Sequence, residues 1–303
     1  MKVNKIRQNV FPVLAALIWG TAFVAQSVSA DIVEPFTFNT ARAAVAFLFL
    51  LVLCAVFRRL RRRDFAASAE VRPHARRDLV LGSLCCGVAL TVAANLQQKG
   101  LETTTSGKAG FITALYVVLV PVFGLFFKRK VSLPTWIAVV LSVVALYLLC
   151  IMGDFSLAPG DPLVLVCAVC FAVHILVIDH FTAYCDGVKL SCLQFLFAGI
   201  ISTICMFIFE DVDFAAILSC ALPLLYVGIF SCGVGYTLQI LAQKDSNPTV
   251  VTILLSLESV FAVIAGAIIL KQQMTVREYI GCAIMFAAVI LAQIQFPTRQ
   301  KAE

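Results

Sequence analysis

Charged residues are scarce in this sequence. Only 13% of its residues are charged and 61% are hydrophobic, whereas soluble domains have roughly a quarter charged and half apolar residues. A soluble protein of 303 residues would need a polar surface that so few charged residues cannot cover. The composition therefore argues against an ordinary soluble protein and indicates that lipid contacts much of the surface.

The sequence also lacks the spacings of a metal or nucleotide site. Cys167 and Cys170 form a single C-x-x-C without the second pair of ligands that a zinc site needs. Six residues separate Gly100 from Gly107, where a phosphate-binding loop has four, and Ala109 replaces its Ser or Thr. We therefore expect no metal, no other cofactor and no ATP-hydrolysing site within this chain.

Long apolar stretches do occur, and they recur from one end of the chain to the other. Each is about 20 residues long, the length that crosses a bilayer as a helix, and joints rich in Gly, Asp, Asn and Pro separate them. The first is longer than the apolar core of a signal peptide, so we interpret it as a span. The pattern predicts an all-α membrane protein with about ten transmembrane helices. The predicted spans are residues 10–30, 35–57, 79–101, 105–127, 132–152, 162–182, 188–209, 221–243, 248–270 and 276–296.

Basic residues lie mainly in the joints between these stretches. Most of the 23 Lys and Arg fall on one side of the membrane if the N-terminus is cytoplasmic, and the positive-inside rule then places both termini in the cytoplasm. The densest cluster, residues 58–77, has almost no aromatic residue among its arginines, unlike a nucleic-acid surface. We predict a multi-pass protein of the cell membrane, surrounded by the lipid bilayer and without a nucleic-acid partner.

The two halves of the sequence are similar to one another. Residues 128–136, for example, align with residues 271–279. Because five spans per half is an odd number, the second half must be inverted relative to the first. We predict two inverted five-helix repeats, residues 1–152 and 153–303. Inverted repeats are a recurring plan of secondary transporters, with the substrate site near the midplane between the halves.

Several segments resemble the EamA family of the drug/metabolite transporter superfamily. Residues 236–244, 248–270 and 281–291 are similar to the second repeat of that family, and residues 17–24 with Arg42 are similar to the first. The resemblance covers nearly the whole chain. It implies ten spans in two inverted halves, a central cavity, and transport of amino acids, other metabolites or drugs.

The sequence departs from the family pattern at two places. Glu258-Ser259 stands where the family usually has Glu-Pro, and Lys271-Gln272 stands where it usually has Gly-Glu. The first departure predicts that a helix kink is absent, because proline is a usual cause of kinks. The second leaves the outer end of the ninth span open.

Arg42 and Glu258 are charged residues within predicted spans, where a charge is costly. Arg42 lies about 7 residues, roughly 10 Å, from the outer end of the second span. With Asn39 one turn earlier, it offers donors that suit a carboxylate or phosphate group. Glu258 lies near the middle of the ninth span, where it can bind a substrate amine or exchange a proton. The alternative is a structural salt bridge between Arg42 and Glu258.

Polar and aromatic residues complete the candidate site. Gln194 stands at the place in the second repeat that corresponds to Arg42. Trp19, Tyr116 and Tyr236 each combine an apolar ring with a polar tip, the usual lining of a small-molecule pocket, although such residues also pack or form interfacial belts. The candidate substrate-binding residues are Trp19, Asn39, Arg42, Tyr116, Gln194, Tyr236 and Glu258.

His174 and Asp179 offer a different interpretation. Their H-x-x-x-x-D spacing occurs in some membrane acyltransferases, but residues five apart on an ideal helix point about 140° away from each other. The rest of an acyltransferase pattern is missing. We therefore interpret His174 as a hydrogen-bonding group between helices.

Together these features predict a secondary transporter and not an enzyme. It would carry a small metabolite, such as an amino acid or related organic solute, across the cell membrane by alternating access. Without a phosphate loop the energy must come from a gradient, and Glu258 makes the proton a candidate coupling ion. The alternative is an intramembrane enzyme of acyltransferase type that uses His174 and Asp179. The sequence leaves the oligomeric state open.

Overall fold

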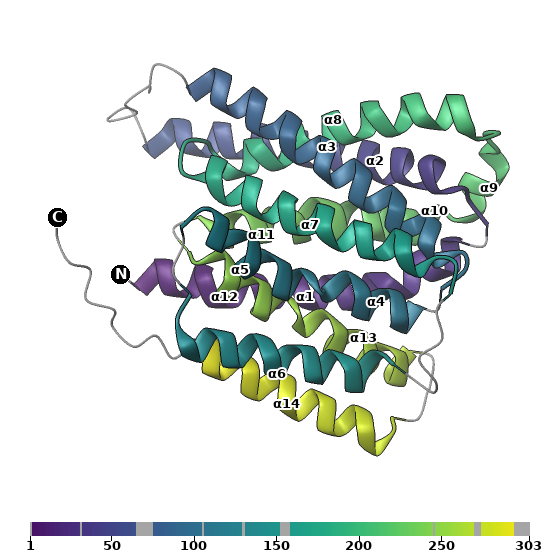
Figure 1. The fold of residues 1–303 in the computed structure, drawn as a ribbon. Helices are drawn as coiled ribbons and strands as arrows, with labels where there is room; N and C mark the ends of the chain where they lie inside the picture. The colour runs from purple at the N-terminus through teal and green to yellow at the C-terminus, as the bar shows by residue number, and fades with distance from the viewer. Residues whose placement is uncertain are drawn as a thin grey trace.

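Helices account for nearly all of the described chain. The computed structural model describes residues 2–30, 32–64, 75–104, 106–128, 131–151, 158–244, 246–269 and 274–293, and these residues form no strand. The long helices run side by side through one bundle (Figure 1).

The helices of the first half are α1 (Lys2–Ala30), α2 (Pro35–Asp64), α3 (Ala75–Leu101), α4 (Ser106–Ala114), α5 (Tyr116–Phe126) and α6 (Leu133–Cys150). Those of the second half are α7 (Asp161–Thr182), α8 (Gly187–Phe209), α9 (Phe214–Ser219), α10 (Ala221–Tyr226), the π-helix η1 (Val227–Gly235), α11 (Tyr236–Gln243), α12 (Pro248–Leu255), α13 (Leu257–Ile269) and α14 (Val276–Gln293).

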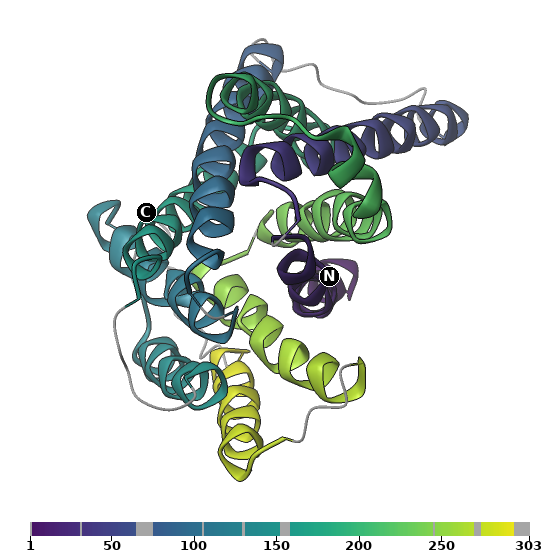
Figure 2. The same ribbon diagram turned by 90° about the vertical axis from the view of Figure 1, so that its right-hand side faces the viewer.

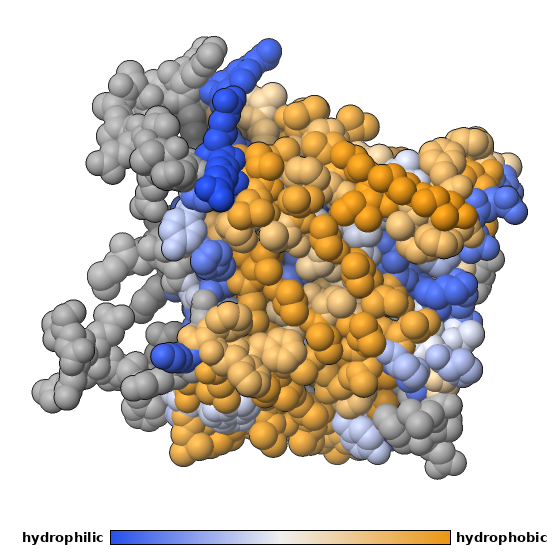
Figure 3. Space-filling model, turned by 45° about the horizontal axis from the view of Figure 1, so that its top comes forward, coloured by the Kyte–Doolittle hydropathy of each residue, from blue (hydrophilic) through white to orange (hydrophobic). Residues whose placement is uncertain are grey.

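The bundle has the length and the surface of a membrane protein. Nine of the described stretches are long and apolar enough to cross a membrane, from Pro35–Arg59 to Val276–Gln293. α1 has 29 residues and packs against α13, so we count it as the tenth span. Large hydrophobic side chains such as Leu48, Val52 and Phe207 are exposed, and Figure 3 shows an apolar belt between two polar ends. The prediction of an all-α membrane protein with about ten spans is confirmed.

The start of α1 and the end of α14 lie at the same end of the bundle (Figure 1). Arg7 Nη2 donates a hydrogen bond to the backbone carbonyl of Lys244 at 3.4 Å, so the joint between α11 and α12 lies there too. We call this the N-terminal end of the bundle. α2 begins at Pro35, after α1 has crossed, and therefore begins at the opposite end.

Short polar side chains in the joints begin several helices. Asp186 Oδ1 accepts hydrogen bonds from the backbone N–H groups of Val188 and Lys189, both at 3.1 Å. Asn247 Oδ1 accepts one from Thr249 at 2.9 Å. Such bonds satisfy amides that have no partner within the helix. The Asp and Asn residues that predict joints in the sequence therefore also cap helices.

The two halves contact one another through corresponding helices. α2 packs against α8 and α6 packs against α14, and each pair joins spans of the same number in the two halves. The packing of α3 on α7 likewise corresponds to that of α1 on α11. Figure 2 shows α6 beside α14, and α1 between α11 and α13. The boundary between residues 152 and 153 lies outside the described residues and stays a prediction.

Two spans are interrupted part of the way along their length. The fourth span is split at Leu115 between α4 and α5, and the ninth is split at Ser256 between α12 and α13. At both breaks a bond closes a tighter turn: the Val118 amide donates to the Leu115 carbonyl at 2.9 Å, and the Ser259 amide donates to the Ser256 carbonyl at 3.3 Å. The breaks therefore occur in corresponding spans of the two halves.

The missing proline predicts a ninth span without a kink, yet its helix is interrupted at Ser256. Ser256 Oγ donates to the carbonyl oxygen of Thr252 at 2.9 Å, a bond that competes with helical hydrogen bonding and bends helices. Ser256 therefore accompanies the interruption. The family usually has a proline directly after the glutamate, and this chain has Ser259 there. The other departure, Lys271-Gln272, lies outside the described residues.

Gly20 allows α1 to approach α13 closely. A Cβ atom on Gly20 would lie 2.6 Å from the carbonyl oxygen of Glu258 and 2.8 Å from the backbone nitrogen of Ala262. Gly110 on α4 is a matched contrast, because a Cβ atom there would meet nothing within 4 Å.

We expect Gly20→Ala to lower the free energy of unfolding by about 1–3 kcal/mol, because backbone atoms would have to move apart. Gly110→Ala should be neutral or slightly stabilising, because alanine favours a helix over glycine. Thermal unfolding of the two purified variants in detergent measures the difference. Equal midpoints for the two variants would contradict the close approach of α1 to α13.

Candidate functional site

A buried cavity lies between the two halves of the bundle. Its volume is about 60 Å³, room for only a few water molecules, whereas small-molecule sites usually measure roughly 300–1,000 Å³. A metabolite would need a larger space than this one. Its lining residues are Trp19, Phe23, Gln26, Arg42, Gln97, Thr113, Tyr116, Phe171, His174, Ile175, Ser231, Tyr236, Gln239, Leu255 and Glu258.

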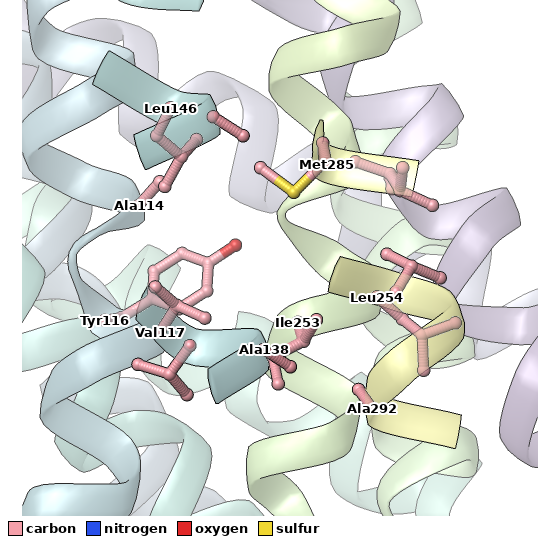
Figure 4. Close-up of a cluster of buried hydrophobic side chains, with 14 of the residues drawn as sticks. Ala114, Tyr116, Val117, Ala138, Leu146, Ile253, Leu254, Met285 and Ala292 are labelled. Carbon is pink, nitrogen blue, oxygen red and sulfur yellow. The ribbon is translucent and has the colours of Figure 1, made fainter. Parts of the chain in front are cut away.

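Tyr116 and Glu258 meet in this cavity at the two helix breaks. Tyr116 is the first residue of α5, and Glu258 lies in the first turn of α13. The Tyr116 hydroxyl donates a hydrogen bond to Glu258 Oε1 at 3.2 Å, and both side chains are buried. Figure 4 shows Tyr116 at the start of α5 with its hydroxyl directed toward the second half. The position also suits a carboxylate, because the N-terminus of a helix attracts negative charge.

Arg42 faces the same cavity from α2. Its Nη1 donates to Gln26 Oε1 at 2.8 Å, and its guanidinium carbon lies 5.5 Å from the centre of the Phe38 ring. Arg42 and Glu258 are both described, and no ion pair within 4.0 Å joins them. The structure therefore differs from the salt-bridge alternative, because each charged group has a different, neutral hydrogen-bond partner.

Trp19 and Tyr236 form an aromatic wall beside these groups. Their ring centroids lie 4.9 Å apart, and Trp19 Nε1 donates to the backbone carbonyl of Ser231 at 3.1 Å. Ser231 belongs to the π-helix η1, a helix type that is frequent at functional sites. A Cβ atom on Gly235 would lie 2.6 Å from Trp19 Nε1, so the end of η1 needs a glycine to admit the indole.

Asn39 and Gln194, also candidates, do not line the cavity. The Asn39 amide donates to Asn95 Oδ1 at 2.7 Å and joins α2 to α3. Gln194 Oε1 lies 3.1 Å from His174 Nε2, and this hydrogen bond joins α8 to α7. Gln194 thus positions His174, which does line the cavity. The other five candidates share the cavity, and a binding role for any of the seven stays a prediction.

The prediction missed several neutral side chains of the lining. Gln26, Gln97 and Gln239 lie within apolar spans, so the rule that marks buried charges as functional could have marked these amides too. His174 makes the predicted bond between helices but also faces the cavity, whereas Asp179 does not line it. Among the described residues, no three His, Cys, Asp or Glu side chains are grouped so that they could hold a metal ion.

A helical membrane bundle of two similar halves, with a cavity between them that charged, polar and aromatic residues line, is typical of a polytopic membrane protein of the transporter type. The model of the EamA-like transporter family matches residues 8–151 and 158–293, and the chain belongs to this family. It is therefore a membrane transporter.

Relatives and a solved structure agree with this assignment. An uncharacterized transporter of Archaeoglobus fulgidus is 30% identical over 97% of this chain and 88% of its own length. One of Methanothermobacter thermautotrophicus is 24% identical over 71% of this chain and 65% of its own. A protein of known crystal structure superposes with a TM-score of 0.77 at 16% identity, covering 94% of this chain and 96% of its own. That likeness shows the shared fold.

Double-mutant cycles test the geometry of the site. We expect Tyr116→Phe and Glu258→Met to couple by roughly 0.5–1.5 kcal/mol in unfolding free energy, because their side chains share a hydrogen bond. Arg42→Met and Glu258→Met should couple by less than about 0.5 kcal/mol, because no bond joins them. Unfolding of the single and double variants in detergent gives both values. Strong coupling of Arg42 to Glu258 alone would restore the salt-bridge interpretation.

Proposed function

We propose that this transporter is a secondary carrier of a small zwitterionic metabolite, such as an amino acid or related organic solute, across the cell membrane. The observation that carries the proposal is that Arg42 and Glu258 line one buried cavity without pairing to each other. A guanidinium suits a substrate carboxylate, and a carboxylate suits a substrate amine. The aromatic wall of Trp19 and Tyr236 suits the apolar part of such a solute.

Alternating access is supported by a second cavity at the N-terminal end of the bundle. This cavity has a volume of about 330 Å³. On α5, Tyr116 lines the central cavity and Val120, one turn further, lines the second; on α7, the neighbours Ile175 and Leu176 do the same. Side chains of these two helices therefore separate the two spaces, and the breaks in the fourth and ninth spans supply places where they can bend.

A proton is the proposed coupling ion, and Glu258 is its proposed carrier. A carboxylate buried within a span is costly when charged and can take up a proton instead. The proposal is of transport and not of catalysis, because Asp179 does not join His174 at the cavity and no further observation favours an acyltransferase.

Transport by purified protein in liposomes tests the proposal. Solutes that accumulate or disappear in cells with and without the protein are first identified by metabolomics, and their uptake is then measured without nucleotide. Uptake that is flat across amino acids and related solutes, or that requires ATP, would contradict the proposed function.

We expect Glu258→Gln to weaken transport, because the substrate amine loses its carboxylate partner, and to abolish the pH dependence and the ionophore sensitivity of the transport that remains, while the protein stays folded. Glutamine keeps the shape and can accept the Tyr116 hydrogen bond, but it cannot exchange a proton. Glu102→Gln is the control, because Glu102 pairs with Lys99 outside the cavity. Glu258→Gln protein with an unchanged pH profile would contradict the role of Glu258 in coupling.

Both termini are proposed to be cytoplasmic. A reporter that fluoresces only in the cytoplasm should be bright when fused after Lys301 and dark when inserted after Asp213, because most basic residues belong to the side of the termini. Fluorescence of cells that express each fusion checks this. A dark Lys301 fusion would contradict the proposed orientation.

A further inference from the structure

Two residues that line the central cavity each have one buried polar atom without a hydrogen-bond partner. These atoms are Gln239 Oε1 and His174 Nδ1, on side chains that are 2% and 0% exposed. Buried polar atoms are nearly always hydrogen-bonded, because an unpaired one keeps the full cost of losing water. Because both residues line one cavity, a molecule bound there is a candidate partner for these atoms.

Both atoms accept hydrogen bonds in the arrangement that the structure shows. Gln194 Oε1 lies 3.1 Å from His174 Nε2, so this nitrogen carries the proton and Nδ1 of the neutral ring is an acceptor. Gln239 Oε1 is a carbonyl oxygen and accepts as well. The group that satisfies them must therefore present N–H or O–H donors.

Tyr236 links the two acceptors in space. Its ring centroid lies 5.9 Å from that of His174, edge to face, and it lies one helical turn before Gln239 on α11. His174 therefore contacts the ring of Tyr236, and Gln239 follows Tyr236 on a neighbouring turn of α11.

Gln239 lies toward the N-terminal end of the cavity, and Arg42 lies toward the other end. Arg42 comes seven residues after Pro35, about 10 Å from the end where α2 begins. Gln239 comes four residues before Gln243, about 6 Å from the N-terminal end, where α11 finishes. Glu258 lies between these levels, ten residues or about 15 Å along the ninth span from Pro248.

We propose that His174 and Gln239 form a neutral hydrogen-bonding subsite that recognises a hydroxyl or amide group on the side chain of the substrate. This inference rests on the proposed function: a zwitterion held between Arg42 and Glu258 directs its side chain past Tyr236 toward the two acceptors. The preferred substrates are then amino acids with a hydroxyl or amide and not wholly apolar ones. A site built to bond such a group rejects the analogue that lacks it, because the acceptors are then left unpaired.

Matched pairs of amino acids test the subsite. Threonine and valine differ by a hydroxyl in place of a methyl group, and glutamine and methionine differ by an amide in place of a thioether. Calorimetric titration of the purified wild-type protein should show at least about tenfold tighter binding of threonine over valine, and of glutamine over methionine.

The expected ratio falls toward one in Gln239→Met and in His174→Phe, which remove the acceptors but keep much of the side-chain volume. Gln243→Met is the matched control. Gln243 lies one turn further along α11 and is also buried with an unpaired Oε1, but its amide donates to the Ile175 carbonyl at 2.8 Å and it does not line the cavity. The ratio should be unchanged in this control.

The outcomes separate the subsite from the proposed function. Equal binding of both members of each pair by the wild-type protein would overturn the subsite alone and leave water as the partner of the two acceptors. The same result follows if Gln239→Met and Gln243→Met change the ratio alike. A wild-type protein that binds none of the four amino acids would overturn the proposed function, and the subsite with it.

Discussion

Inside a bilayer, backbone amides and carbonyls have no water to bond with, and the architecture of this transporter depends on that constraint. Uninterrupted helices satisfy it wherever the chain contacts lipid, as the exposed apolar belt requires. Irregular backbone is tolerated only where protein or a cavity surrounds it. The breaks at Leu115 and Ser256 and the π-helix obey this rule, because Tyr116, Glu258 and Ser231 beside them all line the cavity.

The same constraint explains why charge is concentrated at one place inside the bundle. A buried guanidinium or carboxylate is tolerated when neighbouring groups share its charge, and here each has a separate neutral partner. Arg42 donates a hydrogen bond to Gln26, and Glu258 accepts one from Tyr116. Arg42 and Glu258 are therefore not bonded to each other. A direct ion pair would have left little for a solute to bind. The arrangement keeps two opposite charges available within one small space.

The sequence was sufficient to predict the helical membrane fold, because apolar length alone sets the spans and caps set many of their ends. It was also sufficient to select five residues that line the cavity, since charges and amphipathic rings stand out within apolar runs: Arg42, Glu258, Trp19, Tyr116 and Tyr236. It was insufficient where a residue's direction mattered: spans that are apolar on all sides give no periodicity, so Asn39 and Gln194 could not be separated from Gln26, Gln97 and Gln239. The interruption at Ser256 was missed because no proline marks it, and the Ser256 bond to Thr252 does not distinguish it from Ser142, which makes the same kind of bond within the unbroken α6.

The bond between Tyr116 and Glu258 has a consequence for the carrier when it is empty. The phenol bonds to one carboxylate oxygen, Oε1, so an amine of the proposed substrate that took this oxygen would displace the phenol and break a link between α5 and α13. Tyr116 would then compete with the proposed substrate for this oxygen of Glu258. In the empty transporter this bond gives Glu258 a protein partner within the membrane, which lowers the cost of burying its carboxyl group.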